Sequence, residues 1–486
     1  MNHSYTSLKK STRGKVVSAA LLGASSAALA QSGPPPAPPT TPSAQAIHTE
    51  LESAMRTIRE LQERVNALEQ QQKAAAAQQA TSTPPLAVAP LPPTERATFI
   101  PAQTLKDNET AAVRVDNATI DPELKGFFRI PGTDTIMKFG GYAKLDFIYD
   151  TKPMGTYDYF ITSALPTSGS DRQRGTQFTA HAKQTRLNMD IRRDTEVGKA
   201  RMFVEGDFFG DASWAYNSGS YQMRLRHAYG QLGNIAAGYG FSAFMDNDAL
   251  PDTLDFEGPG SAPYLLTAGA RYTWKINKAF SLGVAAERPN AEVTTGDSGY
   301  GRSTMPDLVA IGRYETDAGH LQTSALLRRL AYRSGGSRDN AWGYGLNMAG
   351  TYTTFGKDYL AGGAVWGKGI SRYVSDISGL GLDAVAKANG QLDTLTAYGG
   401  YFAYTHYWSP KLRSTGVLNY LGMDRSNALG GGAFKNSQYY SLNVIWNPWG
   451  SLNVGAEVLY GRLKTLDGRT ANDTRVQFSL QYDFVR

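Results

Sequence analysis

The larger, C-terminal part of the chain, residues 126–486, alternates between apolar and polar side chains in one segment after another. In the segment 137–150, for example, Phe139 and Leu145 have one parity and Lys144 has the other. The final segment shows the alternation most clearly, with Val476, Phe478, Leu480, Tyr482 and Phe484 alternating with Arg475, Gln477, Ser479, Gln481 and Asp483. A period of two is that of a β-strand whose two faces meet different surroundings. The pattern therefore predicts an all-β domain.

Sixteen segments of this kind can be counted, an even number as bacterial single-chain barrels have. We expect them to begin near residues 136, 184, 199, 221, 234, 264, 280, 307, 320, 341, 358, 393, 411, 437, 451 and 472. A barrel of sixteen strands encloses an aqueous lumen, whereas one of eight is filled by side chains. The prediction is a 16-stranded antiparallel transmembrane β-barrel over residues 121–486.

A soluble β-sandwich would show the same alternation, but three features favour a membrane barrel. Segments of about ten residues are long enough to cross the hydrocarbon layer as tilted strands. Aromatic pairs near strand ends suit the two membrane–water interfaces, and we assign Tyr440 with Trp446, Trp342 with Tyr344, and Tyr401 with Tyr407 to this outward role. The other face carries many charges. In lipid, only a closed barrel satisfies the backbone groups of every strand.

The N-terminal segment 1–30 has the features of a signal peptide: a basic start, a short apolar run and an Ala28-Leu29-Ala30 cleavage site. Its four basic residues account for most of the net charge, because +6 falls to +2 when Lys9, Lys10, Arg13 and Lys15 are removed. A nucleic-acid partner is therefore not expected. Cysteine is absent, which excludes disulfides, thiolate metal sites and a cysteine nucleophile.

Two linkers and a short helix separate this signal from the barrel. Residues 31–46 are rich in proline, and residues 74–120 form a second linker without a core. Between them, residues 47–73 carry heptads, with Leu51, Ile58 and Val65 at a positions and Ile47, Ala54, Leu61 and Leu68 at d positions. A seam this narrow predicts a self-associating coiled coil rather than a lone amphipathic helix, and its residues lean towards two strands. We expect a periplasmic stalk, with a possible contact to the cell wall.

Residues 243–263 stand out among the connections because they combine five carboxylates with two prolines. The carboxylates are Asp246, Asp248, Asp252, Asp255 and Glu257. An acidic surface loop or a calcium site is one interpretation. The other is a constriction loop folded into the lumen, with its carboxylates facing arginines of the second to fourth strands. The arginines assigned to the pore are Arg186, Arg192, Arg201, Arg224, Arg226 and Arg271. Arginine binds carboxylate solutes through its planar fork, and Arg192 and Arg226 are expected to contribute to anion preference.

Several stretches resemble the DcaP-like outer-membrane porins. They are Arg129-Ile130-Pro131-Gly132-Thr133-Asp134-Thr135 with Lys138-Phe139-Gly140-Gly141-Tyr142, Arg224-Leu225-Arg226-His227-Ala228-Tyr229-Gly230, Phe244-Met245-Asp246, and the run from Pro251 to Pro259. The resemblance, which includes the heptads, covers nearly the whole mature chain. It implies a homotrimeric, sixteen-stranded channel that takes up dicarboxylates and other small anions. A trimer differs from the two-stranded lean of the heptads, and we expect the barrel contacts to prevail.

An enzymatic barrel is the competing class, and a purely structural anchor is a third. His181, His227, His320 and His406 fall on separate segments, without Ser or Asp at motif spacing. No GxSxG, HExxH or Walker motif is present. We therefore expect no catalytic residue, no metal and no cofactor. The sequence predicts a porin in the outer membrane of a Gram-negative bacterium, in contact with the lipid bilayer and with small anionic solutes. A general, non-selective porin is the alternative.

Overall fold

The computed structural model describes residues 126–167, 175–210, 221–295, 299–334, 337–387 and 389–484. The chain divides into two compact units, residues 1–97 and 98–486, and all described residues belong to the second. The expected signal peptide, both linkers and the coiled coil lie outside the described residues. Among the residues that are described, no helix has the length and apolar character that a membrane span requires.

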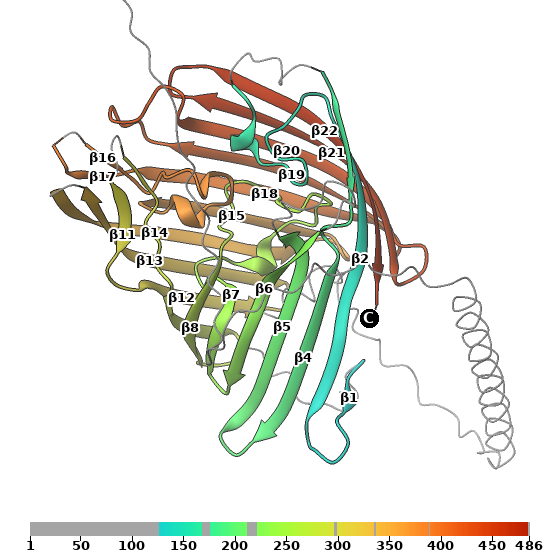
Figure 1. Ribbon diagram of the computed structural model, residues 1–486. Coiled ribbons are helices and arrows are strands. Elements are labelled where there is room, and N and C mark those ends of the chain that lie inside the picture. Colours follow the sequence, from blue (N-terminus) through green and yellow to red (C-terminus); the bar gives the residue numbers. More distant parts are fainter. Residues whose placement is uncertain are drawn as a thin grey trace, which may run out of the picture. The chain divides into compact units, whose positions relative to one another are not determined.

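Sixteen antiparallel strands form a closed ring (Figure 1). Each strand pairs with the next along the chain, and the last pairs with the first, where Phe147 lies opposite Phe478. The ring strands are β2 (Ile136–Asp150), β4 (Arg186–Thr195), β5 (Gly198–Gly210), β6 (Gln222–Leu232), β7 (Ile235–Phe241), β8 (Leu266–Lys275), β9 (Phe280–Glu287), β12 (Asp307–Thr316), β13 (Gly319–Ser334), β14 (Ser337–Thr353), β15 (Tyr359–Lys368), β18 (Thr396–Ser409), β19 (Leu412–Met423), β20 (Phe434–Trp446), β21 (Leu452–Thr465) and β22 (Thr470–Asp483). The predicted 16-stranded barrel is confirmed, and every strand begins within four residues of its expected start.

The remaining elements are short. β1 (Phe128–Arg129) and β3 (Gln177–His181) extend the pairing of β2, and β11 (Tyr300–Ser303) extends that of β13. A separate small sheet contains β10 (Val293–Thr294), β16 (Ala384–Ala386) and β17 (Leu392–Thr394). The described residues of the loops contain four 3-10 turns: η1 (Thr162–Ala164), η3 (Asn247–Ala249), η4 (Ser371–Tyr373) and η5 (Ser375–Ile377).

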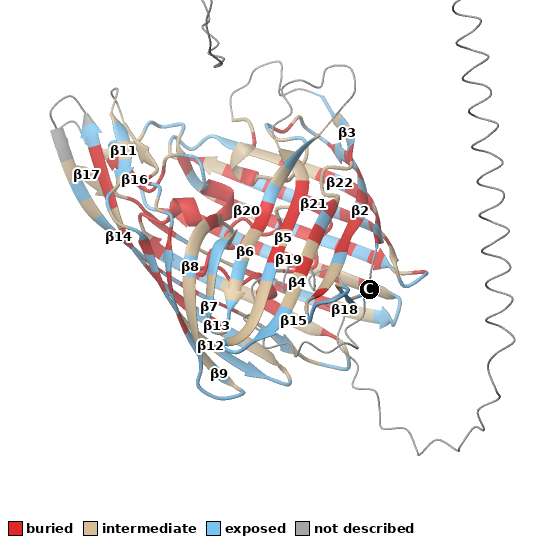
Figure 2. Cartoon of the chain, turned by 60° about the horizontal axis from the view of Figure 1, so that its bottom comes forward, coloured by how far each residue is buried: buried red, intermediate tan, exposed pale blue. Residues whose placement is uncertain are grey.

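The two faces of the wall differ as the alternation predicts, and buried and exposed positions alternate along the strands (Figure 2). Large apolar side chains such as Leu442 and Trp446 are exposed outward, where lipid would cover them. Tyr401 and Tyr407 were expected on that outer face, and this assignment is wrong. Both have the inward parity, and the Tyr401 hydroxyl donates to the Ala249 carbonyl inside the barrel at 3.2 Å. Because β18 carries aromatic residues on both faces, their presence alone does not reveal which face is outward.

The two ends of the barrel differ in the length of their connections. At one end, two residues separate β4 from β5, and two separate β6 from β7. At the other end, residues 242–265 and 369–395 make long connections. Outer-membrane barrels place short turns on the periplasmic side and long loops on the extracellular side. The same rule orients this barrel, with the start of β2 near the periplasm.

Candidate functional site

The connection between β7 and β8, which we call the lumen loop (residues 242–265), runs inside the barrel. Inward side chains of several strands bind its backbone. The Leu254 carbonyl accepts hydrogen bonds from Lys144 Nζ on β2 at 2.6 Å and from Gln477 Nε2 on β22 at 3.0 Å. The Asp252 carbonyl accepts one from Asn443 Nδ2 on β20 at 2.7 Å. These bonds satisfy carbonyl groups that have no partner in a β-ladder.

Most carboxylates of the lumen loop are buried in ion pairs with arginines of β12, β19 and β22. The pairs are Asp246 and Asp248 with Arg313 at 3.2 and 2.6 Å, Asp252 with Arg413 at 2.5 Å, and Asp255 with Arg475 at 3.7 Å. The expectation that these carboxylates face the arginines of β4, β5 and β6 is therefore wrong for these four residues. Their charges anchor the loop to β12, β19 and β22, three other parts of the ring, since a buried charge is costly unless it is paired.

The alternative of a calcium site can be tested on one cluster. One ligand atom each from Asp246, Asp248 and His320 lies within 4.8 Å of the others. However, Arg313 already contacts both carboxylates, and His320 Nε2 lies 2.8 Å from Asp246. Three donors are fewer than the six to eight oxygens that calcium prefers, and a guanidinium repels a cation. The cluster does not fit calcium.

The six arginines assigned to the pore lie on the inner face of neighbouring strands, and we call them the arginine wall. β4 carries Arg186 and Arg192, β5 carries Arg201, β6 carries Arg224 and Arg226, and β8 carries Arg271. Three carboxylates on β4 and β5 form ion pairs with these arginines. Asp190 pairs with Arg192 and Arg201, each at 2.7 Å. Asp207 pairs with Arg224 at 2.6 Å, and Glu205 pairs with Arg226 at 3.1 Å and lies 3.7 Å from Arg186.

Members of the arginine wall differ in their access to the lumen. The side chain of Arg224 is 30% exposed, and those of Arg192 and Arg201 are 13% and 10% exposed. Arg186 and Arg226 are fully buried. Arg226 lies between Glu205 and Asp207 and beneath the ring of Phe256. The expectation that Arg226 acts directly on a passing anion is therefore not supported by its position.

The lumen loop approaches the arginine wall with an aromatic ring. The Phe256 ring centre lies 5.3 Å from the guanidinium carbon of Arg224 and 4.6 Å from the ring of Phe209. Tyr159, from the connection after β2, packs on the same Phe256 ring at 5.8 Å. Nothing in the sequence pattern distinguishes Phe256 or Tyr159, because loop residues have no strand periodicity. They lie beside Arg224, whose side chain is 30% exposed.

Glu257 is a carboxylate of the lumen loop that interacts electrostatically with Arg224 of the arginine wall. Burial raises the pKa of Glu257 to about 7, while Arg224 and a hydrogen bond donated by the Ser375 hydroxyl act in the opposite direction. Near neutral pH this carboxylate therefore changes its charge.

Two other connections pack against the lumen loop and enclose it. In residues 369–383, the backbone N–H of Asp376 donates to the Gly260 carbonyl at 3.0 Å. From the connection after β2, the N–H of Phe160 donates to Asp255 at 3.0 Å, and that of Ser163 donates to Asp376 at 2.8 Å. Burial raises the pKa of Asp255 and of Asp376. Three inward segments thus meet at a junction of carboxylates.

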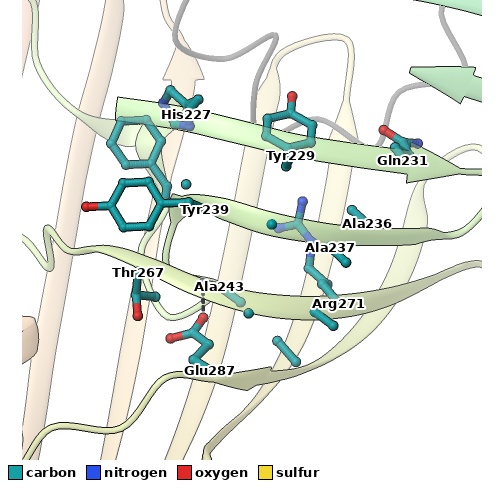
Figure 3. Close-up of a pocket in the computed structure, with 16 residues that line it drawn as sticks. His227, Tyr229, Gln231, Ala236, Ala237, Tyr239, Ala243, Thr267, Arg271 and Glu287 are labelled. Carbon is teal, nitrogen blue, oxygen red and sulfur yellow. Dashed lines mark hydrogen bonds between the residues drawn. The ribbon is translucent and has the colours of Figure 1, made fainter. Parts of the chain in front are cut away.

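A side cavity of about 70 Å³ opens in the wall between β6 and β9 (Figure 3). Arg271, Tyr229 and His227 line it, and Glu287 lies at its edge. Its space comes from small inward residues on β7. Gly238 has a φ of +146°, and a Cβ there would lie 2.3 Å from the Ala228 carbonyl, so that position requires glycine. The sequence analysis did not predict this cavity, although the small residues at alternate positions of β7 could have indicated it.

Comparison with known proteins gives one family. Residues 124–479 match the family model described as porin subfamily. Porin Omp2b of Brucella suis is 28% identical over 169 residues, which is 34% of this chain and 40% of that protein. Porin Omp2b of Brucella neotomae is 26% identical over 266 residues, 50% of this chain and 67% of that protein. The chain thus spans 40% of the length of the first of these relatives and 67% of the second.

A solved structure gives a likeness of fold. The outer membrane channel DcaP of Acinetobacter baumannii superposes with a TM-score of 0.65 at 22% identity, over 74% of this chain and all of that one. At this identity the likeness concerns the fold alone, and it agrees with the ring of sixteen strands described above.

Proposed function

This chain belongs to the porin subfamily, and from that membership we propose that it is a passive outer-membrane channel that prefers small anionic solutes of the dicarboxylate type. Solutes move down their own gradient through the lumen. The narrow part of the path lies where Phe256 and Tyr159 approach Arg224. The proposal includes no chemical step, because a channel of this kind changes the position of its solute and not its bonds.

One observation carries the anion preference. The arginine wall contains six guanidinium groups, and the same strands supply three carboxylates to pair with them, Asp190, Glu205 and Asp207. Counted with these three carboxylates alone, the wall has three more positive charges than negative charges. Glu287, which acts on Arg271, and Glu257, which acts on Arg224, reduce this excess without reversing it. In a lumen with low-dielectric walls, an excess of one sign raises the local concentration of ions of the opposite sign.

The accessible arginines are arranged along the direction of transport. Arg224 lies opposite Asp207 on β5, and Arg201 is six residues nearer to the periplasmic end of the same strand, about 20 Å along it. Arg192 lies directly opposite Arg201 on β4. A dicarboxylate can thus pass from Arg224 to the pair formed by Arg192 and Arg201. The guanidinium fork binds a carboxylate through two parallel hydrogen bonds.

A general, non-selective porin is the second candidate. It is favoured by the close pairing of most lumen charges, since Arg192 and Arg201 both contact Asp190 at 2.7 Å. A paired charge produces a weaker field at a distance than a single charge does.

We propose in addition that three chains assemble as a homotrimer, and that residues 47–73 form a coiled-coil stalk on the periplasmic side. The heptad pattern supports the stalk, and family membership supports an assembly of barrels. A possible contact between this stalk and the cell wall belongs to the same proposal.

The test is single-channel current of the purified full chain in a planar bilayer, titrated with succinate or phthalate. Stepwise conductance in threes, with blocking events that increase with dicarboxylate, is the expected result. Conductance without blocking and with a reversal potential near zero would favour the non-selective candidate. Absence of conductance would overturn the channel proposal.

A further inference from the structure

A cluster of cations lies on the outer surface of the barrel, on the side away from the lumen. We call Lys152, Lys435, Arg462 and Lys464 the outward basic patch. Arg462 and Lys464 have the same parity on β21 as the exposed Val458 and Tyr460, so they point outward. Lys435 is exposed on β20, and Lys152 is exposed just after β2.

The patch has a defined height relative to the aromatic residues. Tyr440 on β20 and Tyr460 on β21 are cross-strand neighbours, with stacked rings 6.3 Å apart. Rings of this kind mark the membrane–water interface. Arg462 is two residues beyond Tyr460, and Lys464 is two further, on the side of the long loops. At about 6.7 Å for each pair of residues, the cations reach the level of lipid headgroups on the extracellular side.

Strand pairing brings the members of the patch together. Arg462 lies opposite Asn472 on β22, and Lys152 donates a hydrogen bond to the Asn472 side chain. In the row above, Lys464 lies opposite Asn436, the neighbour of Lys435. The four side chains thus lie on β20, on β21 and just after β2, and Asn472 of β22 lies between Arg462 and Lys152.

The carboxylates nearby do not neutralise the patch. Within the part of the chain that the structure describes, Lys435, Arg462 and Lys464 form no ion pair. Asp473 has the inward parity and accepts from the Thr151 hydroxyl at 2.8 Å, and Asp467 pairs with Arg469 at 2.8 Å. Asp424 is exposed at the end of β19. Like charges on adjacent strands repel one another unless an anion lies between them.

We propose that the outward basic patch binds the phosphate groups of an anionic lipid headgroup in the outer leaflet of the outer membrane. Clusters of Lys and Arg beside an apolar membrane face attract anionic headgroups. The acyl chains of such a lipid would cover the apolar strip below, which includes Leu442, Val444 and Val458. A soluble anion would gain only the first of these two contacts, so the surface favours a lipid.

The experiment measures lipid binding to the purified full chain in detergent by native mass spectrometry. The probes are diphosphoryl lipid A, the same lipid without its phosphates, and sodium phosphate. The test variant is Arg462→Gln with Lys464→Gln. The matched control is Arg193→Gln with Lys278→Gln, which removes the same two charge types from exposed positions near the short turns.

The test variant should bind diphosphoryl lipid A about thirtyfold more weakly than the unmodified chain does, since each surface cation contributes about a factor of five. The control should stay within about twofold of the unmodified chain. A second variant, Lys152→Gln with Lys435→Gln, should show a similar loss and guards against a folding defect in the first.

Three results would overturn the proposal: equal affinity of test variant and control, equal binding of the phosphate-free lipid, or displacement of the lipid by sodium phosphate at equal concentration. The last would indicate a site for free phosphate instead. Because the patch lies outside the lumen, failure here would leave the channel proposal untouched.

Discussion

Arg224 and Arg226 show how two residues of one type can have different roles on one strand. Both contact Asp207, at 2.6 and 3.3 Å, and both lie near Phe256. A β-bulge between β5 and β6 leaves Arg226 without a residue directly opposite it on β5, and Arg226 is fully buried whereas Arg224 is 30% exposed. Charge pattern alone could not separate them, because the bulge is set by tertiary packing. We therefore assign solute contact to Arg224 and a structural role to Arg226.

Arg224→Gln should lower the anion-to-cation permeability ratio about tenfold. A unit charge about 6 Å from the path contributes about 0.7 kcal/mol in water, with opposite signs for an anion and a cation, and the difference of about 1.4 kcal/mol corresponds to that factor. The reversal potential in a tenfold salt gradient measures it. Arg469→Gln, on an exposed turn, is the control and should leave the ratio unchanged. If the ratio of Arg224→Gln equals that of the control, Arg224 does not act on permeating ions.

Anion preference should rise as the pH falls from 8 to 6. Burial raises the pKa of Glu257 to about 7, so its carboxylate is ionised at pH 8 and neutral at pH 6. Loss of this negative charge leaves Arg224 less compensated, which favours anions. Glu257→Gln, which can still accept from Ser375, should abolish this pH dependence. A variant that keeps the full pH response would assign the titration to Asp255 or Asp376, whose pKa values burial also raises.

At the scale of elements, the strands were predictable and the loops were not. The strand starts in the structure agree with the predicted ones because a half-buried strand needs an alternating sequence, as in Val476 to Tyr482. The lumen loop has no such constraint, so its partners depend on distant residues. Arg313, Arg413 and Arg475 stand 65, 161 and 220 positions from the carboxylates that they bind. The sequence pattern could show that these three arginines point inward, but it could not show which carboxylate each of them binds.

The pair of Asp252 and Arg413 should show strong coupling in a double-mutant cycle. Each single change to Ala leaves a buried charge without its partner, and we expect a cost of about 3–5 kcal/mol. The double variant should cost less than the two single changes together, because no charge is then left unpaired. The free energy of unfolding in urea measures the coupling.

The exposed pair of Asp467 and Arg469 provides the control cycle and should show little coupling. In single-channel records, the Arg413→Ala variant should also show greater current noise, since it releases one anchor of the lumen loop. Additive single changes at Asp252 and Arg413 would contradict the anchoring role.

At the scale of the whole molecule, the barrel contains every contact of the proposed path. Its strands, lumen loop and arginine wall all lie between residues 136 and 483. The stalk prediction concerns residues outside the described part of the chain and stays a prediction. The channel and the stalk can therefore be tested separately.

Deletion of residues 31–118 should leave the conductance of each channel unchanged, because no strand of the ring comes from that region. Single-channel current compares the deleted and full chains in the same bilayer. A change in the number of linked conductance steps would indicate that the stalk contributes to assembly. Loss of all conductance would contradict the separation of channel and stalk.

Closure of the ring has a consequence for biogenesis. The seam between β2 and β22 is held by Arg475 and Asp150, whose side chains meet at 2.7 Å although they are 325 positions apart in the chain. The strand made first therefore keeps an open edge until the strand made last arrives. An open edge is a template for pairing with other chains. Until the ring closes, pairing with other chains competes with folding, and truncation before β22 would leave that edge of β2 open permanently.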